Sequence, residues 1–193
     1  RNVYALNGQR TRPMTVRRAY QVPAPFGADV GGVNPSFVAF NPAAAYDSWL
    51  TIGMTDASDV GALSSIAIDF STWSTGDLTA DNGAVFWMNP DAAPEGDAVI
   101  AQLTVEQTWG TLATMNFEGR SMIGEDWVAN EVVFSGSSWS AWRTTPCTTT
   151  GSSTCNNLIS REGRSPTLGV PFGSFSLAGR DIVLAGQVGS FGG

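Results

Sequence analysis

The amino-acid sequence predicts an all-β fold, β-sandwich or jelly-roll-like, with an extended N-terminal arm, and three observations support this fold class. Apolar residues recur at a period of two in short runs, which is typical of half-buried strands. Gly-, Asn-Pro- and Ser/Thr-rich turn signals separate most of these runs. No stretch of about a dozen residues has a persuasive helical period. At 193 residues the chain is long enough for one domain with a real core.

Residues 1–36 are predicted to form an extended arm rather than part of the core. Prolines and glycines interrupt every periodic run in this segment, and its apolar residues are spread thinly. The first 18 residues carry five arginines and no acid, whereas residues 19–119 carry twelve acids and no base. We expect the arm to lie on an acidic surface, of its own body or of a neighbouring subunit. The arm cations are Arg1, Arg10, Arg12, Arg17 and Arg18.

Residues 37–193 are predicted to form a single β-sandwich domain of roughly ten strands. The organising stretch is residues 84–105, where two apolar runs flank a turn built on Asn89-Pro90, and we expect it to be the central hairpin. A single helical turn is allowed at residues 43–46 or 105–109. The candidate strands are residues 36–40, 48–54, 64–70, 84–88, 98–105, 111–117, 127–134, 138–143, 173–177 and 181–188.

The two cysteines, Cys147 and Cys155, lie in a Ser/Thr-rich loop at residues 144–157 and are predicted to form a disulfide. Closing this loop would stabilise the fold by about 2–3 kcal/mol through the entropy of the unfolded chain. A disulfide implies an extracytoplasmic location, secreted, cell-surface or periplasmic. The alternative is a pair of thiols in a reducing compartment, although the loop is too polar to bury them.

The absence of His and Lys from the sequence excludes several reaction classes. A serine triad lacks its usual base, and Schiff-base and P-loop chemistry lack their lysine. A glycosidase would need two carboxylates beside a Trp-lined cleft, and no pair stands out. We therefore expect a protein without enzymatic activity. Nucleic-acid binding is not expected from an acidic body, and no window is apolar enough to span a membrane.

Two sets of residues are candidates for ligand binding. Asp91, Glu95 and Asp97 share one turn and could bind calcium, which takes carboxylate and carbonyl oxygens; solvated turn acids are the alternative. No other cofactor is expected. Seven tryptophans are present, and some of them could form a platform for a glycan or a protein partner, although Trp is also a core residue. The platform candidates are Trp49, Trp87, Trp139 and Trp142.

Five segments, DSWLTIG, LSSIAIDFS, NGAVFWMNPD, VIAQLTV and TMNFEGRS, resemble extracellular β-sandwich modules of secreted and cell-surface proteins in bacteria and marine algae. The resemblance covers about half of the chain and includes no catalytic motif. It implies an extracellular β-sandwich, of a kind that often has no assigned enzymatic activity.

These observations together lead us to expect a non-enzymatic extracytoplasmic subunit of a surface layer, filament, appendage or large complex. It would join copies of itself or other protein subunits through its N-terminal arm and its aromatic surfaces. The alternative is a carbohydrate- or calcium-binding β-sandwich module. These two hypotheses belong to different classes, and the first depends on where residues 1–36 lie.

Overall fold

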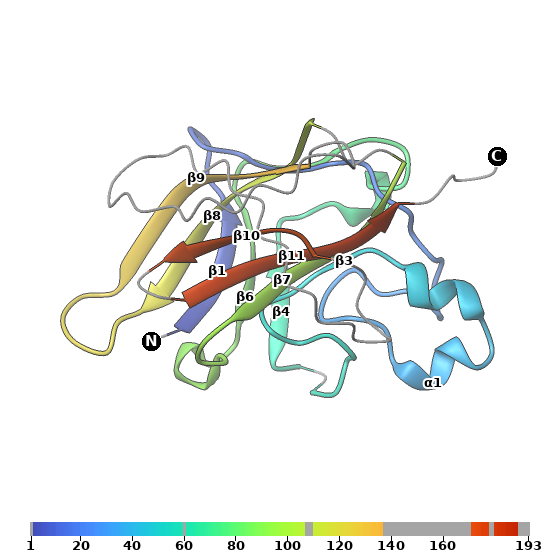
Figure 1. Cartoon of the computed structure of the whole chain (residues 1–193), viewed down its shortest axis with the longest axis horizontal. Coiled ribbons are helices and arrows are strands. Elements are labelled where there is room, and N and C mark those ends of the chain that lie inside the picture. The colour runs from blue at the N-terminus through green and yellow to red at the C-terminus, as the bar shows by residue number, and fades with distance from the viewer. Residues whose placement is uncertain (1, 60, 107–109, 137–170, 178–179, 189–193) are drawn as a thin grey trace.

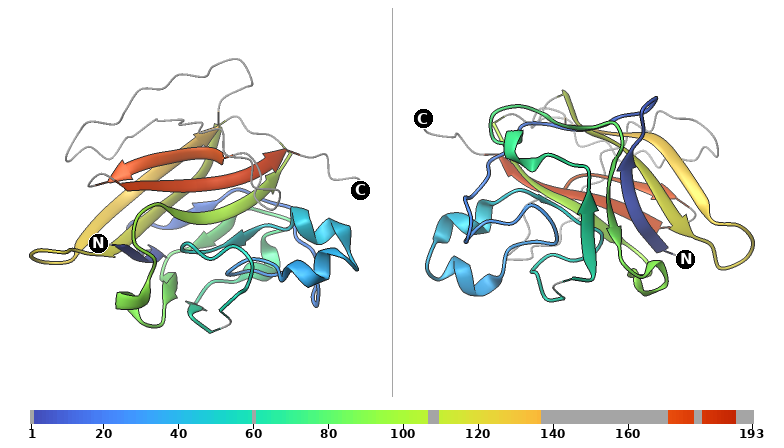
Figure 2. Two further views of the ribbon diagram at one scale, coloured as in Figure 1. Left: turned by 60° about the horizontal axis from the view of Figure 1, so that its bottom comes forward. Right: turned by 180° about the vertical axis from the view of Figure 1, so that it is seen from behind.

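A computed structural model of the chain contains two β-sheets that pack face to face (Figure 1). It describes residues 2–59, 61–106, 110–136, 171–177 and 180–188, of which residues 136, 171–177 and 180–188 are described by their backbone alone. The predicted all-β, sandwich-like fold is confirmed, whereas the jelly-roll connectivity stays a prediction. In the right view of Figure 2 the small sheet lies behind the large one, and the strands of the two sheets cross at an angle.

The strands of the described chain vary in length from the two residues of β3 to the eleven of β8, and the helical elements are single turns. The strands are β1 (Asn2–Gly8), β2 (Met14–Val16), β3 (Trp49–Leu50), β4 (Leu63–Ile66), β5 (Leu78–Ala80), β6 (Gly83–Trp87), β7 (Ala98–Val105), β8 (Gly110–Arg120), β9 (Trp127–Gly136), β10 (Pro171–Leu177) and β11 (Arg180–Val188). The α-helix is α1 (Pro35–Val38), and the 3-10 helices are η1 (Pro42–Tyr46), η2 (Phe70–Thr72) and η3 (Pro90–Ala92).

The large sheet contains β4, β6, β1, β8, β2, β5 and β9, and two of its strand lines are interrupted. β1 and β2 run in the same direction along one side of β8, with Asn7 opposite Asn116 and Val16 opposite Ala113. Residues 9–13 leave this line and return to it. Beside it, β5 pairs with β2 and β6 pairs with β1, so β5 and β6 also form one line broken at residues 81–82.

The small sheet has the order β10, β11, β7, β3. β7 pairs in parallel with β11 and antiparallel with the two-residue strand β3. The expected central hairpin of residues 84–88 and 98–105 is therefore wrong, because β6 lies in the large sheet and β7 in the small one. The turn at Asn89-Pro90 carries the chain from one sheet to the other, and a sandwich needs such a crossing.

One hydrophobic core fills the space between the sheets. β8 contributes residues that alternate along the strand, Ala113, Met115 and Phe117, as the period of two predicts. The small sheet supplies Leu50, Ile100, Leu103 and Val105 from the other side. Both faces of β7 are buried, because a second cluster, formed by Val33, Ala44 and Trp49, covers the far side of the small sheet.

The prediction that residues 1–36 form an arm outside the core is wrong. Val3, Leu6, Met14 and Val16 are buried in the core, and β1 and β2 lie inside the large sheet between β8 and the β5–β6 line. The prolines and glycines do interrupt the segment, but the interruption is a local excursion at residues 9–13. The spacing of apolar residues in the sequence does not reveal this strand line, because the five residues 9–13 are inserted between β1 and β2, which follow one another in the sheet.

Three Asn-Pro pairs begin helical turns rather than strands. The side chains of Asn34, Asn41 and Asn89 each accept a hydrogen bond from the backbone N–H two residues later, and a proline follows at the first helical position. The predicted strand at residues 36–40 is therefore wrong, because α1 occupies it. The helical turn predicted at residues 43–46 is confirmed as η1.

Most of the later strand predictions are confirmed, with small shifts at their ends. Residues 111–117, 127–134, 173–177 and 181–188 fall within β8, β9, β10 and β11. The strand predicted at residues 64–70 ends at Ile66, because Ala67 has a φ of 52° and turns the chain. Ile66 consequently faces solvent and not the core. The predicted strand at 138–143 lies outside the described residues.

Candidate functional site

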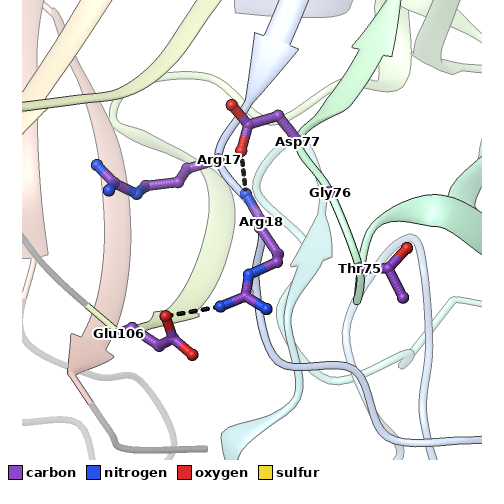
Figure 3. Close-up of a pocket in the computed structure, with 6 residues that line it drawn as sticks. All are labelled: Arg17, Arg18, Thr75, Gly76, Asp77 and Glu106. Carbon is purple, nitrogen blue, oxygen red and sulfur yellow. Dashed lines mark hydrogen bonds and ion pairs between the residues drawn. The ribbon is translucent and has the colours of Figure 1, made fainter.

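A polar pocket of about 300 Å³ opens where the chain leaves β2 (Figure 3). It is lined by residues from three parts of the chain: Arg17 and Arg18 after β2, the turn Thr75–Asp77 before β5, and Glu106 after β7. Two hydrogen bonds fix the backbone of Arg17: its N–H donates to the Leu112 carbonyl at 2.8 Å, and its carbonyl accepts from the buried Trp73 Nε1 at 2.9 Å.

The charges of the pocket compensate each other. The Arg18 N–H donates to Asp77 Oδ1 at 2.8 Å, and Arg18 Nη2 lies 2.6 Å from Glu106 Oε2. Figure 3 shows the Arg17 side chain extending away from Asp77, on the far side from Thr75. A ligand would have to displace the half-exposed Arg18–Glu106 pair. We therefore interpret this pocket as a contact that holds three chain segments together, and not as a site that is open to a ligand.

A second polar cluster lies on the outer face of the large sheet, the face turned away from the small sheet. Glu118 on β8 is held by two donors from β1: Asn7 Nδ2 at 2.8 Å and the Tyr4 hydroxyl at 3.2 Å. Burial, and then the charge of Glu118, raise the pKa of Tyr4. The Arg120 guanidinium lies over the Tyr4 ring, 5.6 Å from its centre. This cluster presents a fixed carboxylate beside an aromatic ring.

Asn116 forms hydrogen bonds to backbone groups beside the interruption of the strands. Its Nδ2 donates to the carbonyls of Asn7 and Arg12, at 3.0 and 2.8 Å, across the excursion of residues 9–13. Its Oδ1 accepts from the N–H of Glu131 at 2.9 Å, where β9 bulges and Glu131 has a φ of 53°. A single buried side chain thus connects β1, the excursion and β9.

Asp47 has a comparable role in the chain that covers the small sheet. Its carboxylate accepts the backbone N–H groups of Val22 at 2.7 Å and Ala28 at 2.6 Å, and so closes the loop between them. The side chain is fully buried. This burial raises the pKa of Asp47 to about 6, although the backbone hydrogen bonds oppose the shift and the nearby Asp29 adds to it.

The raised pKa of Asp47 predicts that stability falls as pH rises from about 4 to about 6. The folded protein binds a proton in that range, whereas an unfolded aspartate with a pKa of about 3.9 has released it. The stability from this group is complete below about pH 4, and about 2–3 kcal/mol of it is lost by pH 7. Urea unfolding at several pH values measures this loss. Asp47→Asn should remove that part of the pH dependence, and an unchanged pH profile in the variant would contradict the assignment.

The arm arginines lie on the protein's own body. Arg12 Nε is 3.7 Å from Glu131 Oε2, and Arg18 contacts Glu106 as described above. Arg10 is exposed in the excursion, and Arg17 lines the pocket. Arg1 lies outside the described residues. The expected meeting of basic and acidic parts therefore occurs within one chain.

The predicted calcium ligands do not converge. Asp91 Oδ1 lies 3.3 Å from Arg120 Nε, and the same guanidinium contacts Asp126 at 2.7 Å. Glu95 forms a backbone bridge with Asn2. Among the described side chains, no three His, Cys, Asp or Glu residues form a group that could hold a metal ion. Calcium binding stays a prediction without a geometric site in this part of the chain.

The tryptophan platform is wrong for Trp49, which is buried in the cluster under α1 and η1. Trp87 is only partly exposed and packs against the core, and its Nε1 donates to the Ile52 carbonyl at 2.8 Å. Trp139 and Trp142, together with Cys147, Cys155 and the loop 144–157, lie outside the described residues. The platform and disulfide predictions for those residues stay predictions.

Sequence reasoning missed Asn7, Asn116 and Asp47 as organising residues. Asn116 and Asn7 stand in strand runs where polar residues alternate with apolar ones, so nothing distinguishes them from solvent-facing positions. Asp47 follows a helical turn, where an acid is usually exposed. Each of these side chains matters because a chain segment that is distant in the sequence approaches it and forms a hydrogen bond with it.

The chain matches no protein-family model, no curated protein sequence and no solved structure. None of the helices in the described part of the chain has the length and apolarity that a membrane span requires. A functional assignment therefore has to come from the surfaces and sites of the chain itself.

Proposed function

We propose that this protein is a non-enzymatic, extracytoplasmic assembly subunit that joins copies of itself or other protein subunits. A surface layer, a filament, an appendage or a large complex would use such a subunit. The observation that carries the proposal is a set of exposed apolar side chains at the margins of the outer face of the large sheet. Ile66 on β4, Met88 after β6 and Val128 on β9 are 61%, 62% and 57% exposed. Burying such side chains against a partner stabilises a complex.

In this proposal the outer face of the large sheet, and not the N-terminal segment, makes the contact with other subunits. β1 and β2 are held inside the large sheet and are not available to run across a neighbour. The outer face is continuous across the sheet, because register places Ser64, Phe86, Ala5, Glu118 and Val128 in one row. The centre of the outer face is polar and its margins are apolar. A matching partner surface would have polar groups at its centre and apolar groups at its margins.

Light scattering on purified protein tests the proposal. We expect a mass above that of the monomer, rising with protein concentration, and a lower mass when Met88 and Val128 are both changed to Ser. Phe40→Ser is the matched control, since Phe40 is 80% exposed in the loop after α1 and away from the large sheet. A wild-type protein that stays monomeric at every concentration would count against self-assembly.

A glycan-binding module is the second candidate, and the cluster around Glu118 favours it. Sugars are commonly bound by an aromatic ring beside groups that exchange hydrogen bonds with hydroxyls, and Tyr4, Asn7 and Glu118 have this chemistry. Glycan-array binding that is lost in Glu118→Gln but kept in Met88→Ser would favour this candidate. The opposite pattern, with no glycan bound and assembly lost in Met88→Ser, would favour the assembly subunit.

A further inference from the structure

Among the described residues, the large sheet ends at β4, whose outer edge is paired with no further strand. β4 pairs with β6 on one side, and no strand of the described chain pairs with its other side. The Met88 N–H donates to the Ala62 carbonyl at 2.8 Å. Because hydrogen-bonded pairs alternate along an antiparallel ladder, Ser64 and Ile66 also direct their backbone groups to β6. The N–H and C=O groups of Leu63 and Ser65 therefore point away from the sheet.

This edge has few of the features by which proteins prevent strand pairing. The segment LSSI contains no charge and no proline, and only Ala67, with its positive φ, limits its length. The opposite edge of the described sheet is different, because β9 is interrupted by its bulge at Glu131. β4 is thus an edge of the large sheet at which another strand could add.

We propose that two copies of this protein pair antiparallel through β4, with the twofold axis at Ser64, so that their large sheets form one continuous sheet. Leu63 of each copy would then lie opposite Ser65 of the other, and these pairs would exchange about four hydrogen bonds. A second copy fits this register, because the exposed Ile66 of each copy then faces the small Ala62 of the other and lies near its exposed Met88. This inference rests on the proposed assembly function and specifies its contact.

The same register covers two exposed apolar side chains. Ala62, Ser64 and Ile66 face outward, as does Met88, which lies opposite Ala62. With the axis at Ser64, Ile66 of one copy lies opposite Ala62 of the other. The small Ala62 leaves Ile66 room to approach Met88 across it. Two side chains that are about three-fifths exposed in one copy would thus cover each other in the pair.

Charge gives the pairing a predictable salt dependence. Each chain carries a net charge of −7, so two copies repel at low ionic strength. Salt screens this repulsion and leaves the backbone hydrogen bonds and the apolar contacts in place. We therefore expect the dimer to strengthen as salt is raised. Association driven by ion pairs would instead weaken with salt.

Ser65→Pro tests the edge directly, because it removes an N–H that points to the partner and to no strand of its own copy. Sedimentation velocity should show a loss of dimer in Ser65→Pro and retention in Ser65→Ala, which keeps the N–H. Circular dichroism melting establishes that both variants fold. If Ser65→Pro folds and still dimerises as the wild type does, the edge pairing is overturned while the assembly function stands.

A cysteine pair tests the register. Two Ser64 residues on the axis form a non-hydrogen-bonded pair with Cα atoms about 4.5 Å apart, within disulfide range. Ser64→Cys should therefore give a covalent dimer under mild oxidation. Ser65→Cys is the matched control, because two such residues would lie too far apart to be bridged. Covalent dimer from Ser65→Cys alone would overturn the proposed axis, and a monomeric wild type would overturn both the pairing and self-assembly.

Discussion

Removing residues 1–16 is expected to leave a chain that does not fold. The deletion takes away β1 and β2, which lie between β8 and the β5–β6 line in the large sheet. It also removes Val3, Leu6, Met14 and Val16 from the core. Each buried side chain of this size contributes about 1.5–3 kcal/mol, so the four together contribute about 6–12 kcal/mol. That equals most of the stability of an ordinary domain.

Circular dichroism and tryptophan fluorescence measure the outcome of the deletion. We expect no cooperative thermal transition and no shielded tryptophan emission in the truncated protein. A full-length variant with Arg10, Arg12 and Arg18 changed to Ser is the control. It loses only exposed ion pairs, each worth about 1 kcal/mol or less, and should fold. A truncated protein that melts cooperatively would restore the interpretation of this segment as a detachable arm.

Asn116→Ala is expected to destabilise the fold by about 3–5 kcal/mol, the largest effect we expect from a single polar substitution. Three hydrogen bonds to the backbone are lost at once: those to the carbonyls of Asn7 and Arg12 and the one from the N–H of Glu131. The Arg12 carbonyl keeps the Gln9 N–H as a donor at 2.9 Å. A hydrogen bond contributes about 1 kcal/mol, and each buried group left without a partner costs about 1–3 kcal/mol more. Water entering beside the exposed excursion offsets part of this cost.

Urea unfolding of Asn116→Ala gives this free energy, and Asn130→Ala is the matched control. Asn130 is a neighbour in the β9 bulge whose buried Oδ1 has no partner in the described structure. Removing its side chain therefore breaks no hydrogen bond to that oxygen, and we expect a loss below about 1 kcal/mol. Equal effects in the two variants would show that Asn116 acts by filling space and not by bridging the interrupted strands.

The interrupted strands also bear on function. The excursion at residues 9–13 brings Arg12 onto Glu131, so cations of the predicted arm neutralise acids of their own body. The assembly proposal consequently no longer depends on electrostatic attraction between an arm and a neighbour. It depends on exposed apolar side chains at the margins of the outer face and on an edge of β4 that pairs with no described strand. The expected increase of association with salt follows from that change.

The sequence alone determined the fold class and many element positions of this protein. A period of two identified β8 and β9, and the alternation at Ala113, Met115 and Phe117 identified the inward face of β8. These features are local, because a half-buried strand needs alternating polarity wherever its partner comes from. The absence of His and Lys likewise narrows the chemistry without reference to any fold.

Only the tertiary structure decided what the first 36 residues do and which polar residues matter. β1 and β2 form one strand line because β8 lies beside both, and the paired residues are about 100 positions or more apart in the sequence. Asn116 and Asp47 matter because distant backbone groups need partners that water cannot supply once they are buried. Local sequence encodes the period of a strand, but the neighbours that close a sheet and bury its polar groups are set by the packing of the whole chain.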